Sequence, residues 1–330
     1  MALQKRENKR EGVTFLWYGE SATGKTPTGL SFPKQALFDS DGGTKFYDEY
    51  NDNILVESNT LVFKELNEDL DDLENDDELF GEVETINIDS ATRFHENMKH
   101  ASLKVVEQRA RKGGRLLEGE GLSFKEYGVM GLHYDRFFAR LLTYVKQGKN
   151  LSYVAEQTDE KENRTDSQGN AVSVKIGVKP NLPAGSKFDF DVVVNTYIKD
   201  GKSYGKVEKD RTKTFNIGDE IEMPNYKHWK DAIAKAQTGR IRTKEEIGNF
   251  EDQLNKEAEG LNSVTDTAKA QEVIDEIMAV LTPLPNEKKA EFQTAIIKKY
   301  GDPKFRNETD PKKLKNMLKL LNDIKDGITV

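Results

Sequence analysis

The sequence "GESATGKT", residues 19–26, decides the fold. It fills the spacing G-x-x-x-x-G-K-[ST] without a mismatch. The apolar, β-branched and aromatic run "VTFLWY" at residues 13–18 precedes it and predicts a buried strand. A helix is expected directly after it, because Pro27 suits a first helical turn, where its missing N–H costs little. A strand, a glycine-bearing loop and a helix in this order predict a phosphate-binding loop.

The chemistry of such a loop gives its residues distinct roles. Glycines let backbone N–H groups converge on phosphate oxygens. We expect Lys25 to reach the β- and γ-phosphates of a nucleotide and the Thr26 hydroxyl to bind magnesium. The predicted nucleotide-binding residues are therefore Gly19, Glu20, Ser21, Ala22, Thr23, Gly24, Lys25 and Thr26.

Nucleotide hydrolysis needs two further groups, a second carboxylate for magnesium and a group that orients or deprotonates water. Asp89 ends the apolar strand "TINID" at residues 85–89 and suits the first role. Capping the following helix is the alternative role. Asp89 is followed by Ser90 rather than by an acid, so the catalytic base must come from elsewhere. Asp41, at the tip of the predicted strand at residues 35–43, is the candidate base, or else only a loop residue.

Two polar residues end a further apolar strand, "NLSYVAEQ" at residues 150–157. Gln157 could sense the γ-phosphate through its amide, and Glu156 competes for that role. For either residue, an ordinary place in a turn is the alternative. The candidate catalytic residues are therefore Lys25, Asp41, Glu156 and Gln157.

The composition excludes several other kinds of chemistry. The chain has no cysteine, which removes disulfides, thiolate nucleophiles and zinc–thiolate sites. None of its 4 histidines are spaced three or four apart, so a histidine metal site on a helix is not expected. The apolar runs are too short for a signal peptide or for a membrane span of roughly 20 residues. We therefore expect a soluble cytoplasmic protein with no membrane partner.

Charge is distributed unevenly along the chain, although the net charge is only −8. Residues 46–98 carry 17 acidic and 2 basic side chains, whereas residues 99–149 carry 11 basic and 5 acidic ones. A partner with phosphates would face the second region and be repelled by the first. The alternative is that both regions are ordinary solvated helix surfaces.

The rest of the chain predicts an α/β domain followed by a helical module. Strands alternate with helical patterns, which implies a mostly parallel sheet covered on both faces. The polar stretch 158–186 is too long for a simple connection and predicts a hairpin. Four amphipathic helical patterns follow from about residue 240. We therefore predict two domains, residues 1–239 and 240–330. The predicted strands cover residues 13–18, 35–43, 83–90, 150–157 and 187–198, with terminal strands within residues 200–224.

Several of these segments together resemble a known family. "GESATGKT", "FPKQALFDSDGG", "INIDS", "NLSYVAEQ" and "KPNLPAGSKFDFDVVVNTYIKDGK" resemble, in order and spacing, the phage-encoded P-loop ATPases with a RecA-like core. Some members of that group act as single-strand annealing or recombination proteins. The resemblance covers roughly residues 10–235.

The resemblance implies a sheet with an extra strand between the loop strand and the Asp89 strand. It implies ATP and Mg²⁺ at the carboxyl edge of that sheet, with Lys25 and Thr26 at the phosphate and magnesium positions. It also implies assembly into rings or filaments in the bacterial host cytoplasm. Asp41 matches the position of the acidic base and Gln157 the polar switch. Recombinases usually have glutamate where Asp41 stands, a departure that leaves the rate of hydrolysis open but not the binding of ATP.

In the same family, the segments after the third and fourth strands face DNA. They match the basic run "RARKGGR" at residues 109–115 and the insertion at residues 158–186. Binding through these basic side chains should weaken steeply with salt. One of the arginines could instead reach a neighbouring subunit's γ-phosphate, or the segment could be a solvated helix. The candidate DNA-contacting residues are Arg109, Arg111, Lys112 and Arg115.

We therefore expect a magnesium- and ATP-dependent ATPase that forms homo-oligomers and binds single-stranded DNA in recombination, annealing or replication. The C-terminal helices would serve protein partners or assembly. One alternative is a nucleotide-gated interaction or assembly protein with little hydrolysis and no DNA binding, which the acidic balance and the short Asp41 side chain favour. The other is a motor ATPase on duplex DNA or protein, which Ser90 after Asp89 disfavours.

Overall fold

The chain forms two compact units, Met1–Phe250 and Glu251–Val330. The boundary predicted from the sequence lies after residue 239, and the boundary in the structure lies after Phe250. The computed structural model describes residues 7–112, 122, 124–165, 169–248, 250–301 and 304–327.

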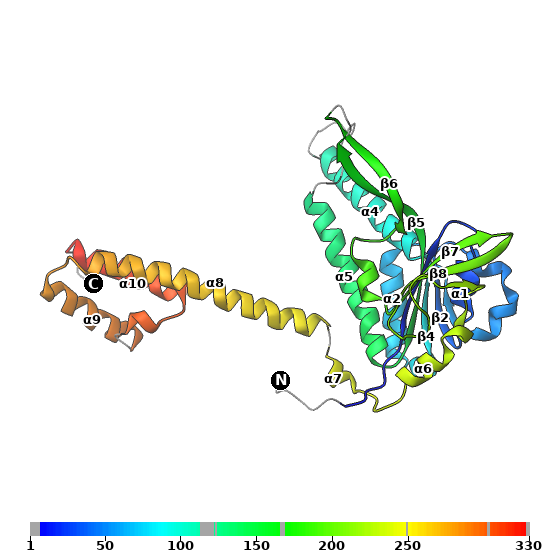
Figure 1. The fold of residues 1–330 in the computed structure, drawn as a ribbon. Coiled ribbons are helices and arrows are strands. Elements are labelled where there is room, and N and C mark those ends of the chain that lie inside the picture. The colour runs from blue at the N-terminus through cyan, green and yellow to red at the C-terminus, as the bar shows by residue number, and fades with distance from the viewer. Residues whose placement is uncertain are drawn as a thin grey trace. The chain divides into compact units, whose positions relative to one another are not determined.

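The first unit is built on a sheet that is mostly parallel (Figure 1). Its strands lie in the order β3-β2-β4-β5-β1-β7-β8-β9, and β6 pairs only with β5. All the pairings from β3 to β7 are parallel, whereas β7–β8, β8–β9 and β5–β6 are antiparallel. The strands are β1 (Thr14–Gly19), β2 (Gln35–Asp39), β3 (Ile54–Ser58), β4 (Thr85–Asp89), β5 (Asn150–Thr165), β6 (Ala171–Pro180), β7 (Val192–Lys199), β8 (Lys202–Asp210) and β9 (Glu220–Glu222).

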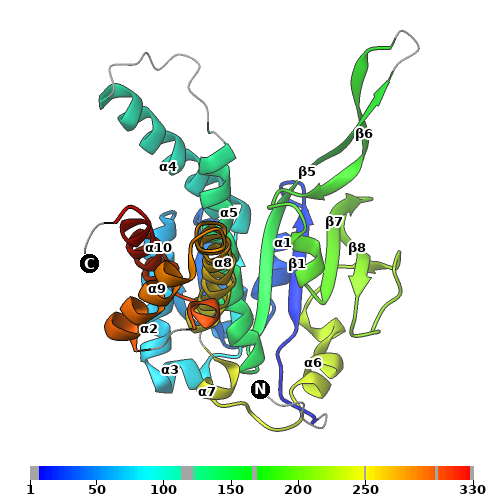
Figure 2. The same ribbon diagram turned by 90° about the vertical axis from the view of Figure 1, so that its left-hand side faces the viewer.

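Helices cover both faces of this sheet (Figure 2). On one face, a hydrophobic core joins the strands to the apolar sides of α2, α3, α4 and α5. On the other face, a second core joins them to α6 and to the segment after α1. The helices of this unit are α1 (Lys25–Leu30), α2 (Phe63–Asn75), α3 (Asp77–Glu82), α4 (Ala91–Lys112), α5 (Phe124–Lys146), α6 (Lys230–Ala236) and α7 (Lys244–Ile247).

The central strand β1 shows why these strands appear as continuous apolar runs. Leu16 and Tyr18 belong to the core on one face, and Phe15 and Trp17 to the core on the other. Every residue of β1 is buried. A strand covered on both faces loses the alternation of apolar and polar residues. The predicted α/β architecture with a mostly parallel sheet is therefore confirmed.

Two details of this sheet bear on the sequence analysis. β5 lies between β1 and β4, as the resemblance implied. The strand β3 was not predicted, because its residues Ile54–Ser58 are alternately half-buried and exposed at the edge of the sheet. The polar stretch after Gln157 forms the predicted hairpin from β5 and β6, which extends away from the body of the unit (Figure 1, Figure 2).

The second unit is helical, as predicted, with its own apolar core. It contains most of α8 (Phe250–Leu281), α9 (Asn286–Tyr300) and α10 (Pro311–Lys325). Asp310 caps α10, since its carboxylate accepts a 2.8 Å hydrogen bond from the Lys312 N–H. The first of the four predicted helical patterns is divided between α7 and the start of α8, and the second continues α8. The core is formed by Ala270, Val273, Ile274, Ile277, Phe292, Ile296, Leu314, Met317, Leu320, Leu321 and Ile324.

Within the described part of the chain, none of the helices combines the length and the apolar character that crossing a lipid bilayer requires.

Candidate nucleotide site

The predicted site residues meet at the carboxyl edge of the parallel strands. β1 ends at Gly19, which pairs in register with Glu156 on β5 and with Thr196 on β7. β4 ends at Asp89, next to the end of β2. The topology therefore brings together five segments that lie far apart in the sequence. This edge is where open α/β sheets bind ligands.

The two glycines of the loop are required by close approaches. Gly24 has a φ of 90°, and a Cβ there would lie 2.4 Å from Ser203 Oγ. A Cβ on Gly19 would lie 2.2 Å from the carbonyl oxygen of Thr196. A side chain at Gly19 would require the backbone of β7 to move, and one at Gly24 would strain the loop backbone and displace the Ser203 side chain. The backbone of the loop is thus held against β7 and β8.

Thr23 fixes the loop in this position. Its hydroxyl donates to the carbonyl oxygen of Glu20 at 2.8 Å and lies 2.7 Å from the Thr196 hydroxyl. The Ser203 hydroxyl in turn donates to the Thr23 carbonyl oxygen at 2.7 Å. Thr23 is almost fully buried, so these hydrogen bonds hold the loop in one shape. Ser21 and Ala22 form the exposed crest of the loop, and Ala22 has a left-handed φ of 60°.

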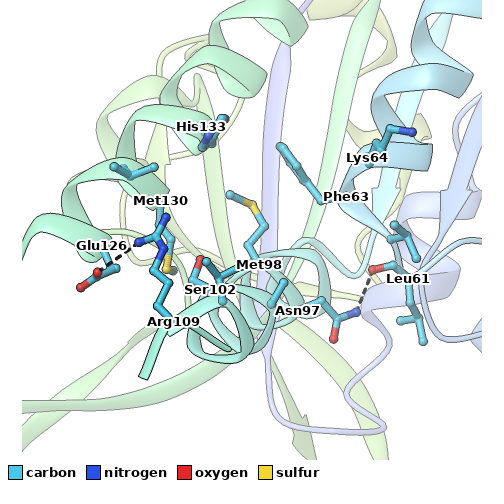
Figure 3. A pocket seen from close by; sticks show the side chains of 14 residues that line it. Leu61, Phe63, Lys64, Asn97, Met98, Ser102, Arg109, Glu126, Met130 and His133 are labelled. Carbon is cyan, nitrogen blue, oxygen red and sulfur yellow. Dashed lines mark hydrogen bonds and ion pairs between the residues drawn. The ribbon is translucent and has the colours of Figure 1, made fainter. Parts of the chain in front are cut away.

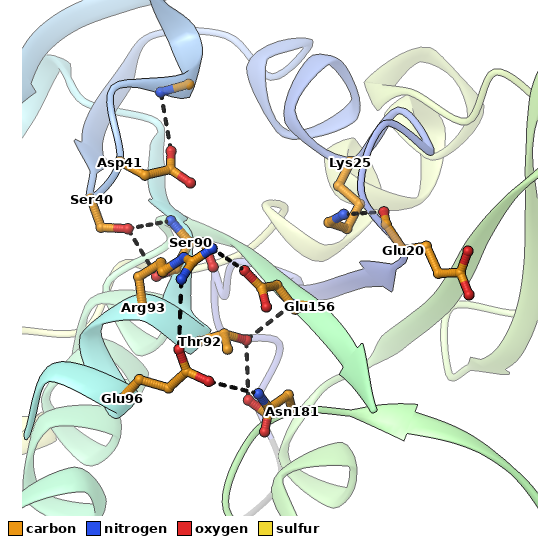
Figure 4. Close-up of polar contacts among 11 residues, drawn as sticks. Glu20, Lys25, Ser40, Asp41, Ser90, Thr92, Arg93, Glu96, Glu156 and Asn181 are labelled. Carbon is orange, nitrogen blue, oxygen red and sulfur yellow. Dashed lines mark hydrogen bonds and ion pairs between the residues drawn. The ribbon is translucent and has the colours of Figure 1, made fainter. Parts of the chain in front are cut away.

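Lys25 opens α1 and points across the loop. Its ammonium group donates a 2.5 Å hydrogen bond to the Glu20 carbonyl oxygen (Figure 4). Burial lowers its pKa, and the charges of Asp89, Glu156 and Asp41 act in the opposite direction. The lysine therefore lies within electrostatic reach of all three predicted carboxylates.

Thr26 and Asp89 lie near each other. The Thr26 side chain lies close enough to the Asp89 carboxyl to lower its pKa, and Asp89 is only 4% exposed. Burial raises the pKa of Asp89 to about 7, and the neighbouring carboxylates of Asp41 and Asp39 add to the effect. Within the described part of the chain, the carboxylate oxygen Oδ2 of Asp89 is buried and has no hydrogen-bond partner.

This pair fits a magnesium ion. A buried carboxylate oxygen without a partner, beside a hydroxyl oxygen, is the kind of oxygen ligand that Mg²⁺ prefers. The described residues contain no group of three or more acidic or histidine side chains placed to hold a metal. A magnesium ion here would therefore take its remaining ligands from phosphates and water, as Mg²⁺ does in nucleotide sites.

Asp39, which ends β2, and Asp41, which follows it in the loop, differ in their surroundings. Asp39 is buried, and its carboxylate accepts hydrogen bonds from the N–H groups of Asp41, Gly42, Gly43 and Thr44. It thereby shapes the loop. Asp41 is exposed on that loop, and its carboxylate accepts only one hydrogen bond there, from the Gly43 N–H at 3.1 Å. Desolvation and then the Asp39 charge raise the pKa of Asp41.

The side chains of Glu156 and Gln157, both within β5, make different contacts. Gln157 donates a 3.0 Å hydrogen bond to the Glu20 carboxylate in the phosphate loop. Glu156 instead pairs with Arg93, with Oε1 3.0 Å from Nη2 (Figure 4). Either side chain thus lies beside the loop, and only the glutamate has a cationic partner in the first turn of α4.

Arg93 was not predicted from the sequence as a residue of this site. The residue follows Asp89 by one helical turn, and its charge lowers the pKa of Asp41 while its guanidinium pairs with Glu156. In the sequence it looks like any solvated helix residue. Thr196 and Ser203, which support the loop, were missed as well, although the polar pair after the apolar run of β7 indicates a sheet edge.

The predicted DNA-contacting residues lie at the end of α4. Arg111 and Lys112 are exposed there. Arg109 is exposed too, but it pairs with Glu126 on α5 at 3.8 Å. Arg115 lies outside the described residues. In both ribbon views, the end of α4 and the hairpin extend from the same side of the sheet (Figure 1, Figure 2).

A pocket of about 760 Å³ lies between the start of α2 and the facing sides of α4 and α5 (Figure 3). Its lining is mainly apolar, with Arg109 and Glu126 at one side. Leu61, Val62, Val105 and Val129 line it and are each more than a third exposed.

Comparison with known proteins agrees with this geometry. The family model described as AAA domain matches residues 11–216, a span that holds the phosphate loop, Asp89 and the hairpin. No curated protein matches the chain.

Proposed function

The chain belongs to the AAA domain family of P-loop ATPases, and we propose that it is a magnesium-dependent ATPase that binds single-stranded DNA in its ATP-bound state. The proposal includes assembly of several copies on the strand, in the manner of the phage recombination ATPases that the sequence resembles. The second unit would then serve assembly or a protein partner.

One observation carries the ATPase part of this proposal. Thr26, at the end of a loop in which glycine is sterically required, lies near a buried Asp89 whose Oδ2 has no partner among the described residues. A carboxylate buried without a partner is costly unless a ligand supplies one. This arrangement is explained by a magnesium ion that binds together with a nucleotide.

The residues around the loop would have separate roles in hydrolysis. Thr26 and Asp89 would hold magnesium, which, when bound, neutralises charge on the phosphates. Lys25 would exchange the Glu20 carbonyl for a phosphate oxygen. Asp41 is the better candidate base, because its raised pKa makes it more basic than an ordinary aspartate.

The DNA part of the proposal rests on where α4, with its basic end, and the hairpin of β5 and β6 begin. β5 passes the phosphate loop at Gln157 and continues directly into the hairpin, and α4 begins beside Asp89 and ends at Arg111 and Lys112. Both elements thus start at the nucleotide site and extend to the same side of the sheet (Figure 2). The presence or loss of the γ-phosphate would therefore affect the positions of both α4 and the hairpin.

Salt-dependent binding of a labelled single strand tests this function. We expect tighter binding with a non-hydrolysable ATP analogue and Mg²⁺ than with ADP. The double substitution of Arg111 and Lys112 by alanine should reduce the slope of log affinity against log salt by about 1.4, since each single-strand phosphate contact contributes about 0.7. Arg109→Ala is the matched control, because this arginine is already paired with Glu126. Binding that ignores salt and nucleotide would contradict the proposal.

The apolar pocket favours a second candidate function, a nucleotide-gated interaction protein without DNA binding. The pocket lies against α4, the helix that begins at the nucleotide site, and large apolar side chains are exposed in it. If the same assay shows ATP binding but no strand binding at any salt concentration, this second function replaces the first.

A further inference from the structure

The ion pair between Arg93 and Glu156 joins the start of α4 to β5. Arg93 lies in the first turn of α4, and Glu156 lies near the end of the buried part of β5. Arg93 Nη2 is 3.0 Å from Glu156 Oε1, and Nη1 is 3.8 Å from Glu96 Oε2. The guanidinium is 48% exposed and the Glu156 carboxylate 38%, so the pair is open to competing ligands.

Beneath this pair, two hydrogen bonds to Thr92 tie both ends of the hairpin to α4, and a third joins the two ends to each other. The Thr92 hydroxyl accepts from the Glu156 N–H at 3.0 Å and donates to the Asn181 carbonyl oxygen at 3.0 Å. The Asn181 N–H donates to the Glu156 carbonyl oxygen at 2.7 Å. Glu156 precedes the hairpin and Asn181 follows it. Both strands of the hairpin therefore leave from a single clamp that is centred on the first turn of α4.

A side-chain bond completes the clamp. The Asn181 amide donates to Glu96 Oε1 at 3.1 Å, and Glu96 also faces Arg93 (Figure 4). The arginine thus contacts the carboxylate that begins the hairpin and the carboxylate that holds the residue at its end. Movement of this one guanidinium would change both contacts.

The same arginine lies at the nucleotide site. Glu156 is opposite Gly19, the first residue of the phosphate loop, in the sheet register. Figure 4 shows Arg93 between Asp41 and Glu156, across from Lys25. The charges of Asp41 and Glu156 both act on Lys25, so both carboxylates lie within electrostatic reach of the lysine. A γ-phosphate held by Lys25 would lie near them.

We propose that Arg93 is a positioning residue that exchanges Glu156 for the γ-phosphate of ATP and thereby releases the clamp at the base of the hairpin. A guanidinium offers a planar fork of donors that suits a carboxylate and a phosphate equally well. The terminal phosphate carries more negative charge than the carboxylate, and the existing pair is exposed and weak. This inference rests on the proposed function, because it requires ATP at the loop.

The affinities for Mg²⁺ with a non-hydrolysable ATP analogue and with ADP test the first half of the inference. Arg93→Ala should weaken binding of the analogue about tenfold or more and leave ADP binding unchanged, since only the analogue has a γ-phosphate. Glu156→Gln should not weaken binding of the analogue, because it frees the arginine. A purely structural ion pair would make both variants change in the same direction.

Hydrogen–deuterium exchange of the strands β5 and β6 tests the second half. In the native protein, the analogue should speed exchange at the base of the hairpin relative to ADP. Arg93→Ala at saturating analogue should show no such difference, whereas Glu156→Gln should exchange fast without any nucleotide. Arg211→Ala is the control, because Arg211 pairs with Asp191 at the opposite edge of the sheet and should behave like the native protein.

The outcomes separate the inference from the function beneath it. A native protein that binds neither nucleotide contradicts the proposed function itself. A native protein that binds the analogue, with an Arg93→Ala variant that discriminates between analogue and ADP as well as before, overturns only the role of Arg93. An Arg93→Ala hairpin that still responds to the analogue also overturns it. Arg93→Lys keeps the charge without the fork and should recover part of the discrimination.

Discussion

Gln157 on β5 donates a 3.0 Å hydrogen bond to the carboxylate of Glu20, so the strand that becomes the hairpin is tied to the phosphate loop. The other end of the same amide accepts a 3.3 Å hydrogen bond from Asn195 on β7. The amide is therefore held in one orientation between two elements. A side chain fixed in this way next to the loop can report a change in the loop to the strand that carries it.

The substitution Gln157→Ala tests this relationship. We expect the affinity for ATP to change by less than about threefold, because the two lost hydrogen bonds are partly exposed. They join Gln157 to the side chains of Glu20 and Asn195, and neither involves Lys25 or Thr26. The preference for single-stranded DNA with ATP over ADP should be lost. Fluorescence anisotropy with a labelled strand measures both affinities. Gln237→Ala, which removes a similar hydrogen bond to the Gly148 carbonyl at the far edge, should leave the preference intact.

Gly24→Ala tests the steric requirement of the loop. The new methyl group would meet Ser203 Oγ, and the backbone at a φ of 90° would be strained. We expect loss of ATP binding together with a lower melting temperature. Gly42→Ala is the matched control, since Gly42 also has a positive φ but its Cβ would meet nothing within 4 Å. Equal effects of the two substitutions on nucleotide binding would contradict the steric account.

The substitution Asp89→Asn separates the effect of the buried carboxylate on stability from its effect on ATP hydrolysis. A buried carboxylate with an unpartnered oxygen destabilises the nucleotide-free protein at pH 8, so we expect the asparagine variant to be no less stable than the native chain. Hydrolysis should nevertheless fall by about two orders of magnitude, because magnesium loses its protein carboxylate. Thermal unfolding and a phosphate-release assay measure the two effects.

Asp39→Asn provides the contrast to that variant. Asp39 is equally buried, but its two oxygens accept hydrogen bonds from four backbone N–H groups and from the Thr44 hydroxyl. An amide cannot accept all of them, so the melting temperature should fall by several degrees. A stable Asp39→Asn variant and an unstable Asp89→Asn variant would reverse the assignment of structural and functional carboxylates.

Lys149 gives the fold a distinct pH dependence. Its ammonium group donates to the carbonyl oxygens of Phe80 at 2.5 Å and Val83 at 2.6 Å, and burial lowers its pKa to about 8 from an ordinary 10.5. Between these values the unfolded chain holds the proton and the folded chain has lost it. The free energy of unfolding should therefore rise with pH from 8 to 10.5, relative to a Lys149→Met variant. Parallel pH curves for the two proteins would show that the lysine does not titrate in this way.

Much of this fold follows from local patterns in the sequence. "VTFLWY" and "TINID" form continuous apolar runs because β1 and β4 are covered on both faces, and the phosphate loop has a spacing that few other structures require. The strand β3 carries no such signal. Its residues Ile54–Ser58 lie at the sheet edge and need to bury only alternate side chains, so the run is too mixed to stand out.

The site was only partly accessible to the same reasoning. Asp89 and Asp41 could be found because Asp89 ends a strand and Asp41 follows the end of another by two residues, and strand ends meet at one edge. Arg93 could not, because its meaning depends on Glu156, which the crossover through α4 and α5 brings back beside it. The separation of Asp39 from Asp41 also needed the structure, since only the hydrogen bonds of the loop show which carboxylate is already satisfied.

The most direct test of the central claim is calorimetric titration of ATP with Mg²⁺ into the native chain and the Lys25→Ala variant. The account predicts saturable binding at one site per chain in the native protein and a loss of at least about tenfold in affinity in the variant. Removal of magnesium should weaken the native interaction as well. Absence of heat from native protein that is folded, or equal affinity in the variant, would contradict the claim that this loop holds a nucleotide.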